Sequence, residues 1–212
     1  MATDFLFDGP NNARVTILLA HGAGAPMDSA SMNAVAKVLA AAGFRVARFE
    51  FALLEAERVR HRTAPPKAET VMPQYVAAID DLHAKGPLII GGKSMGGRVA
   101  SMIADDEFAN GRIAGLLCLG YPFHPMGRPD QLRTKHLLDL KTPTLICQGT
   151  RDELGNRFEV GDYGLSDEIE VFWLEDGDHD LKPRKAISGF TTAQHLQGVA
   201  DKVVEWTKRI VP

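Results

Sequence analysis

An apolar run that stops abruptly at a serine between glycines is the feature that most constrains the fold of this chain. The run Leu88–Gly92 has the composition of a strand buried on both faces, and a helix-like run over residues 99–104 follows almost at once. Between them, residues 92–96 read Gly-Lys-Ser-Met-Gly. This G-x-S-x-G pattern, with a strand before it and a helix after it, is typical of a very tight strand-to-helix turn.

In a turn of this kind the strand and the helix nearly touch. A side chain two residues before or after Ser94 would collide with the neighbouring backbone, and glycine removes that collision while tolerating a strained conformation. The Ser94 hydroxyl then projects above the sheet beside a helix N-terminus, whose N–H groups favour negative charge. The pattern therefore indicates a nucleophilic serine; the alternative is a glycine-rich turn that binds a phosphate or merely connects two elements.

The whole chain of 212 residues fits one domain, residues 1–212, with a composition ordinary for a globular protein: 45% apolar and 24% charged. Its net charge of −3 gives no electrostatic footprint for nucleic acid or an anionic membrane, so we expect neither as a partner. No apolar run approaches the ~20 residues that span a bilayer. Acidic Asp4 and Asp8 stand where a signal peptide needs positive charge, which predicts a cytoplasmic protein.

Cys118 and Cys147 both fall inside apolar runs. We expect two buried, reduced thiols rather than a disulfide, and a cysteine nucleophile is less favoured still. The two cysteines and the scattered histidines lack the spacing of metal ligands, so the sequence predicts neither a metal nor a cofactor.

Strands are predicted to alternate with helices along the chain. The expected strands are residues 5–7, at a sheet edge, and 14–20, 44–51, 88–92, 113–119, 143–148 and 169–174. One helix is expected after a cap at Ser29 or Asp28, one over residues 71–82 that ends near 85–86, and one after Ser94. A short helix is expected at 131–138 and a closing one at 196–210, whereas residues 55–67 are expected to form a loop. This order predicts an α/β fold: a mainly parallel sheet of about six to eight strands with helices on both faces.

Chemistry in such sheets collects in the loops at the carboxyl ends of the strands. Polar residues of this sequence concentrate in those loops: His21 and the glycine-rich stretch after it, Ser94, residues 121–129, Asp152 and His179. A serine becomes a good nucleophile when an imidazole takes its proton and a carboxylate orients that imidazole.

Of seven histidines, His179 has the best position to be the base. His21, His61 and His83 precede Ser94, and His124 and His136 come before the strand whose end should supply the acid; His195 lies within the closing helix. His179 alone follows a late strand, in a Gly-Asp-His loop, which fits the chain order serine, acid, histidine.

Asp152, just past the strand 143–148, is the best candidate for the acid, with Glu153 as runner-up. Asp176, Asp178 and Asp180 are too close to His179 in sequence to orient it easily. The alternative for Asp152 is a purely structural role in a turn or at a helix cap.

Acyl transfer also needs hydrogen-bond donors for the oxyanion. One should be the N–H of Met95, directly after the nucleophile. The second should come from the loop after strand 14–20, where we favour Ala23 over Gly24.

Four motif blocks carry a resemblance to a known family: His21-Gly-Ala-Gly, Gly92-Lys-Ser-Met-Gly-Gly, Gln148-Gly-Thr-Arg-Asp and Gly177-Asp-His. Together they resemble the α/β-hydrolases, and in particular a small lidless branch related to dienelactone-hydrolase-like proteins that includes the testis-expressed thirty proteins. The resemblance covers nearly the whole chain and implies a catalytic triad of Ser94, Asp152 and His179. Dienelactone hydrolases proper use a cysteine, so their substrate does not carry over to a chain with Ser94.

The chain leaves no room for a large cap domain after strand 113–119, so we expect an open pocket. Tyr121, Phe123, His124 and Met126 could line it, and Lys93 with the basic cluster 58–62 would favour an anionic acyl group; solvated surface charge and ordinary loop packing are the common alternative.

These features predict a serine hydrolase that cleaves an ester or thioester of a small acyl substrate without a cofactor. Amide or peptide cleavage by the same groups is one alternative. The other is a non-catalytic hydrolase-fold module that binds a protein, since part of this branch resembles a subunit of a chromatin-modifying complex.

Overall fold

The computed structural model of the protein describes residues 2–59 and 66–211. In this part of the chain the strands form one seven-stranded sheet in the order β1-β3-β2-β4-β5-β6-β7. The strands are β1 (Phe5–Asp8), β2 (Thr16–Ala20), β3 (Arg45–Phe49), β4 (Leu88–Lys93), β5 (Gly115–Leu119), β6 (Thr144–Gly149) and β7 (Ile169–Leu174). Only the edge strand β1 runs antiparallel to its neighbour, and every other pairing is parallel.

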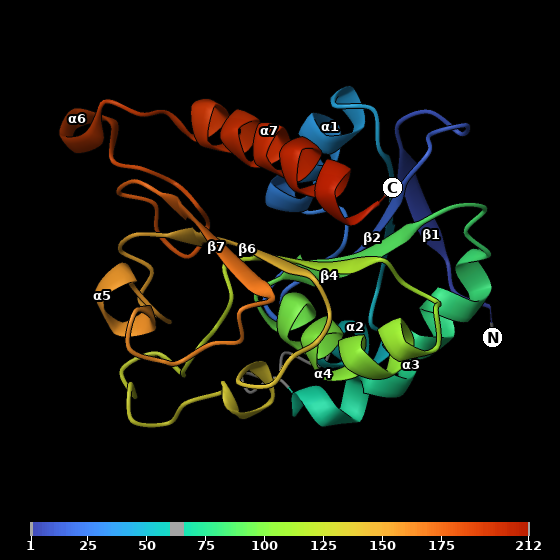
Figure 1. The fold of residues 1–212 in the computed structure, drawn as a ribbon, viewed down its shortest axis with the longest axis horizontal. Coiled ribbons are helices and arrows are strands. Elements are labelled where there is room, and N and C mark those ends of the chain that lie inside the picture. Colours follow the sequence, from blue (N-terminus) through green and yellow to red (C-terminus); the bar gives the residue numbers. More distant parts are fainter. Residues whose placement is uncertain (1, 60–65, 212) are drawn as a thin grey trace.

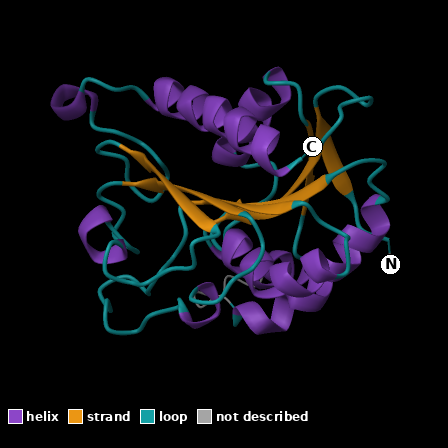
Figure 2. Ribbon diagram, viewed as in Figure 1, coloured by secondary structure: helices purple, strands orange, loops and turns teal. Residues whose placement is uncertain are grey.

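Helices cover both faces of this sheet (Figure 1). They are α1 (Ala30–Ala41), α2 (Ala52–Val59), α3 (Ala68–Leu82), α4 (Met95–Ala109), the 3₁₀ turn η1 (Lys135–Leu137), α5 (Arg157–Val160), α6 (Lys185–Ser188) and α7 (Thr192–Ile210). Helices α1 and α7 lie on one face, and α2, α3 and α4 lie on the other (Figures 1 and 2). The predicted α/β fold with a mainly parallel sheet is therefore confirmed.

The core divides into two layers because side chains alternate across a strand. Along β2, Ile17 and Leu19 pack into the layer under α1 and α7. Leu18 and Ala20 of the same strand pack into the layer under α3 and α4. The central strands are apolar on both faces for this reason, as expected of a covered parallel sheet.

Tyr75 of α3 joins a helix to the middle of the sheet. Its hydroxyl lies 2.9 Å from the Leu18 carbonyl oxygen and 2.6 Å from that of Gly91, and it accepts a hydrogen bond from Gly91 N–H at 2.8 Å. Burial raises the pKa of Tyr75 well above its ordinary value. The side chain is fully buried, so these bonds satisfy polar groups that water cannot reach.

The structure corrects the sequence prediction between strands β3 and β4. Residues 55–67 were expected to form a loop, but α2 extends through residues 52–59. Residues 60–65 lie outside the described part of the chain. The short helix expected at 131–138 is confined to the three-residue turn η1, and the four-residue helices α5 and α6 were not predicted, because elements this short carry too few periodic positions.

Two further expectations concern single residues. Ser29 caps α1, with its side chain accepting a hydrogen bond from Met32 N–H. Cys118 and Cys147 are buried and free, as predicted.

Of the helices in the described residues, none combines the length and apolar character needed to cross a bilayer.

Candidate active site

Ser94 occupies the sharp turn between β4 and α4, with φ 51° and ψ −117°. A Cβ on Gly92 would lie 2.4 Å from the Ala20 carbonyl oxygen, and one on Gly96 would lie 2.4 Å from the same atom. Such distances are too short for any real side chain, so both glycines are needed for strand, turn and helix to approach this closely. The cost of the strained serine backbone is met by packing around it.

Three side chains from different loops form a hydrogen-bonded chain at the carboxyl edge of the sheet. His179 Nε2 lies 2.8 Å from Ser94 Oγ, and His179 Nδ1 lies 2.9 Å and 3.1 Å from the two carboxylate oxygens of Asp152. Asp152 is fully buried, whereas 27% of the His179 side chain is exposed. A proton leaving Ser94 therefore has an acceptor within reach, and that acceptor has a buried carboxylate behind it.

Asp152 is held by groups other than His179. Its Oδ1 accepts a hydrogen bond from Leu154 N–H at 2.8 Å, and its Oδ2 accepts one from the Gln148 amide at 2.9 Å. The same Gln148 side chain accepts from Tyr121 N–H at 2.7 Å. This supporting role of Gln148 was not predicted, and its one signal in the sequence is a polar residue at the end of an otherwise apolar strand. Glu153, the runner-up acid, is exposed.

The loop that carries His179 is fixed on both sides by ion pairs. Asp180 lies 2.7 Å from Lys93 Nζ, and Asp176 pairs with Arg184. Hydrogen bonds from the Arg184 side chain and backbone hold the pKa of Asp176 at about 2. These contacts keep both carboxylates charged and restrict how far the His179 backbone can move.

His21 occupies the loop after β2, where the sequence placed it beside the oxyanion donors. It is fully buried: Nε2 accepts a hydrogen bond from Phe51 N–H at 3.1 Å, and Nδ1 lies 2.7 Å from the Gly22 carbonyl oxygen. This arrangement requires the proton on Nδ1, because Nε2 is an acceptor. His21 thus ties the glycine-rich loop to the start of α2.

A cavity of about 810 Å³ opens beside Ser94. Loops after β2, β4 and β5 and the start of α3 contribute to it. Its lining residues are Ala23, Pro66, Lys67, Ala68, Glu69, Ser94, Met95, Arg98, Pro122, Arg133 and Leu154. Both Met95 and Ala23 border this cavity, whereas Gly24 does not. Among the described residues none accepts a hydrogen bond from Met95 N–H, so that donor is available.

The structure contradicts the predicted pocket lining. Tyr121 and Phe123 are fully buried, and His124 is nearly so, with its Nδ1 2.9 Å from the Pro125 carbonyl oxygen. Pro122 between them lines the cavity, at the centre of a tight turn in which Phe123 N–H donates a hydrogen bond to the Tyr121 carbonyl oxygen at 3.1 Å. Met126 is 68% exposed and does not line the cavity.

Lys93 also lies outside this cavity. It lines a smaller one between α1 and the His179 loop, and its charge is matched by Asp180. Of the basic cluster 58–62, residues 60–62 lie outside the described part of the chain. Among the described residues, Lys67, Arg98 and Arg133 bring positive charge to the main cavity.

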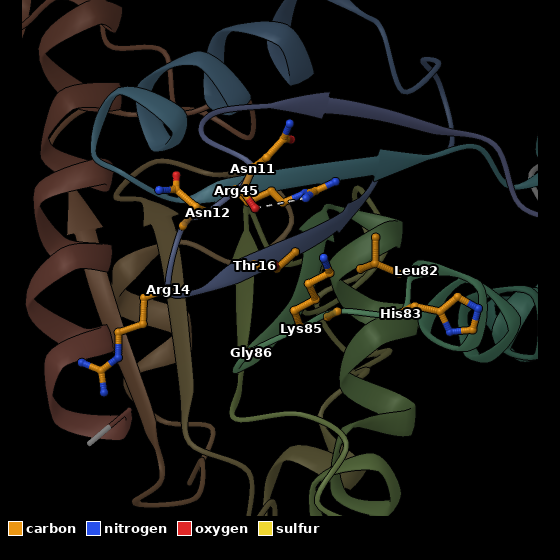
Figure 3. A pocket seen from close by; sticks show the side chains of 11 residues that line it. Asn11, Asn12, Arg14, Thr16, Arg45, Leu82, His83, Lys85 and Gly86 are labelled. Carbon is orange, nitrogen blue, oxygen red and sulfur yellow. Dashed lines mark hydrogen bonds between the residues drawn. The ribbon is translucent and has the colours of Figure 1, made fainter.

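A second large cavity, of about 500 Å³, lies at the opposite, amino edge of the sheet. Figure 3 shows that its labelled side chains come from the turn before β2, from the first residues of β2 and β3, and from the end of α3 with its connection to β4. Arg14 and His83 point away from the centre of this group. The basic side chains there do not converge on one point.

Among the described residues no cluster of histidine, cysteine, aspartate and glutamate could hold a metal ion. The Ser94 hydroxyl and the Met95 N–H border the main cavity, and the imidazole of His179 and the carboxylate of Asp152 are linked to that hydroxyl by hydrogen bonds. Such a set can transfer an acyl group through a covalent intermediate.

The chain matches the model of a known protein family. The model of the α/β-hydrolase domain matches residues 13–208, nearly the whole chain. The chain belongs to the α/β-hydrolase family. The hydrolase fold, the strand-to-helix turn at Ser94 and the absence of a large insertion after β5 agree with that membership.

Solved structures of similar fold include enzymes of the same superfamily. A dienelactone hydrolase from Anabaena variabilis superimposes with a TM-score of 0.74 at 22% identity, over 99% of this chain and 93% of that one. An α/β serine hydrolase without a lid from Xanthomonas campestris gives 0.67 at 18%, over 99% and 90%. Est1E from Butyrivibrio proteoclasticus, with ferulic acid bound, gives 0.68 at 15%, over 99% and 95%. The chain is thus a lidless α/β hydrolase in its architecture.

Proposed function

We propose that this hydrolase is a cytoplasmic serine esterase or thioesterase that acts through an acyl-enzyme on Ser94. The observation that supports the proposal is the unbroken chain of hydrogen bonds from Ser94 Oγ through His179 to buried Asp152. A pure binding module has no physical need for all three groups in this geometry.

The reaction has two halves. His179 Nε2 takes the Ser94 proton while Oγ attacks the carbonyl carbon, and the oxyanion is stabilised by Met95 N–H and a donor at Ala23. The imidazolium then protonates the departing alcohol or thiol as the bond to it breaks. Water, deprotonated by His179, attacks the acyl-enzyme, and the proton returns to Ser94 Oγ as the carboxylic acid leaves. Asp152 orients the imidazole and stabilises its charge throughout.

Labelling with a fluorophosphonate probe tests the proposal directly. The wild-type protein should be labelled, labelling should vanish in Ser94→Ala, and it should fall by at least ~10³-fold in His179→Ala, because the hydroxyl then lacks its base. Intact-protein mass spectrometry should show one adduct, and peptide mapping should locate it on Ser94.

His83→Asn serves as the matched control. His83 is exposed, precedes β4 rather than following it, and has φ 46°, a conformation that asparagine tolerates. Its labelling should equal that of the wild type. A folded wild-type protein that resists the probe, under conditions that label a known esterase, would favour the non-catalytic module instead.

A further inference from the structure

Two arginines border the cavity beside Ser94, and their charges are largely unmatched. We propose that Arg98 and Arg133 form a carboxylate-binding subsite, so that the preferred substrate is an ester or thioester whose acyl part ends in a carboxylate. The inference rests on the proposed function and adds the substrate class to it.

Arg98 lies on the first turn of α4, three residues after Met95, so both face the same side of the helix. Its side chain is only 20% exposed, and its Nε is buried with no hydrogen-bond partner among the described residues. Its ion pair is a long one, 3.5 Å from Nη2 to Glu69 Oε1, and Glu69 is 56% exposed. The long ion pair leaves the exposed part of the guanidinium able to donate hydrogen bonds to a ligand carboxylate in the cavity.

Arg133 approaches the cavity from the segment before η1. Its backbone is fixed by a hydrogen bond from its N–H to the Phe123 carbonyl oxygen at 2.7 Å. No ion pair within the described residues includes its guanidinium, and among those residues Glu69 is the one acidic side chain on the cavity wall. Burial, followed by the nearby charge of Arg98, lowers the pKa of Arg133. The two cations therefore repel one another until an anion lies between them.

The cavity lies on the acyl side of the nucleophile. Ala23 and Met95, which border the cavity, are the proposed donors to the carbonyl oxygen. His179, which must protonate the leaving group, is not among the residues that line it. The leaving group consequently belongs on the His179 side, and the acyl chain extends toward Arg98 and Arg133. Planar guanidinium groups match the two oxygens of a carboxylate, which favours this anion.

The test compares two nearly identical substrates. The mono-4-nitrophenyl ester of adipic acid carries a terminal carboxylate, and its methyl-capped diester does not. We expect the wild-type kcat/KM to be at least about tenfold higher for the acid, since charge-assisted hydrogen bonds of this kind correspond to such a factor. Suberic acid esters repeat the comparison with a longer chain.

Three substitutions and one control variant then test the subsite. Arg98→Gln and Arg133→Gln should each reduce the ratio of kcat/KM for the acid to kcat/KM for the methyl-capped ester to about twofold or less, mainly by raising KM for the acid. Glu69→Gln should raise kcat/KM for the acid a few-fold, because a competing carboxylate is removed. Lys85→Gln is the control: it removes one charge at the opposite cavity and should leave the preference for the acid over the methyl-capped ester unchanged.

Each outcome bears on one of the two proposals. Normal fluorophosphonate labelling together with a wild-type preference that is absent, or that survives both arginine substitutions, would overturn the subsite and leave the serine mechanism standing. Loss of labelling would overturn the mechanism itself. Protection of wild-type Ser94 from the probe by monomethyl adipate, but not by dimethyl adipate, would support the subsite without any turnover, and its absence would contradict it.

Discussion

At the scale of single residues, the site depends on a few side chains that no local pattern identifies. Ser94 and its flanking glycines could be predicted because the sharp turn demands them in sequence. Gln148, which bonds Asp152, and His21, which fixes the glycine-rich loop, act through contacts between distant segments. The pocket prediction failed for a similar reason: the direction in which Pro122 and its neighbours point is set by tertiary packing.

Asp152→Asn tests the orienting role of the carboxylate. The amide can still accept hydrogen bonds, but it presents an N–H or a weaker acceptor to His179 Nδ1 and favours the wrong tautomer of the imidazole. We expect kcat for an activated ester to fall by a factor on the order of 10⁴, with little change in KM. A variant that melts like the wild type yet keeps more than a tenth of its activity would show that another group orients His179.

At the scale of elements, the long and strongly periodic segments followed from sequence, whereas the short ones did not. Strand β7 has the predicted bounds, residues 169–174, and α7 extends its predicted stripe by one turn toward its Thr191 cap. Helix α2 was missed because its charged residues and the prolines after it indicate a loop. The turn η1 is fixed by packing of Leu137 and by polar contacts of His136.

Those contacts of η1 predict a pH dependence of stability. His136 Nε2 lies 2.8 Å from Ser101 Oγ, and burial, followed by the charge of Arg98, lowers the pKa of His136 to about 4. In the unfolded chain this imidazole titrates near pH 6.5. Between these values the unfolded state binds the additional proton, so the free energy of unfolding must decrease as the pH falls from about 6.5 to about 4.

The contribution of His136 can be isolated with His136→Gln, which keeps a hydrogen-bonding side chain but cannot titrate. Urea denaturation at several pH values should show the wild type losing on the order of 1–2 kcal/mol relative to the variant over this interval, allowing for partial exposure to solvent. Parallel curves for the two proteins would mean that His136 is protonated equally in both states.

At the scale of the whole molecule, both layers of the core rest on one sheet. Trp206 of α7 is buried in one layer, and Trp173 of β7 packs against the other. Strands such as β2 and β4 have one face in each layer, so loss of packing in either layer exposes one face of strands that the other layer also needs. This arrangement favours unfolding as one unit.

The cooperativity of unfolding between the two layers can be measured with the two tryptophans. In Trp173→Phe the fluorescence of Trp206 should report on one layer, and in Trp206→Phe that of Trp173 should report on the other. Within each variant, the fluorescence and far-ultraviolet circular dichroism transitions in urea should coincide. A fluorescence transition that separates from the circular dichroism in either variant would divide the chain into two cooperative units.

The two buried thiols can report the rate at which each core layer opens, in addition to its equilibrium stability. Cys118 lies in the layer under α3 and α4, against the Gly97 carbonyl oxygen, and Cys147 lies in the layer under α1 and α7. Burial raises the pKa of both thiols, that of Cys147 to about 12, so neither reacts while the sheet is closed. The rate at which each cysteine undergoes disulfide exchange with an added reagent therefore measures how often its own core layer opens. Because Gly97 lies three residues after Ser94, the exchange rate of Cys118 reports how often the core opens beside the proposed nucleophile, in the wild-type protein.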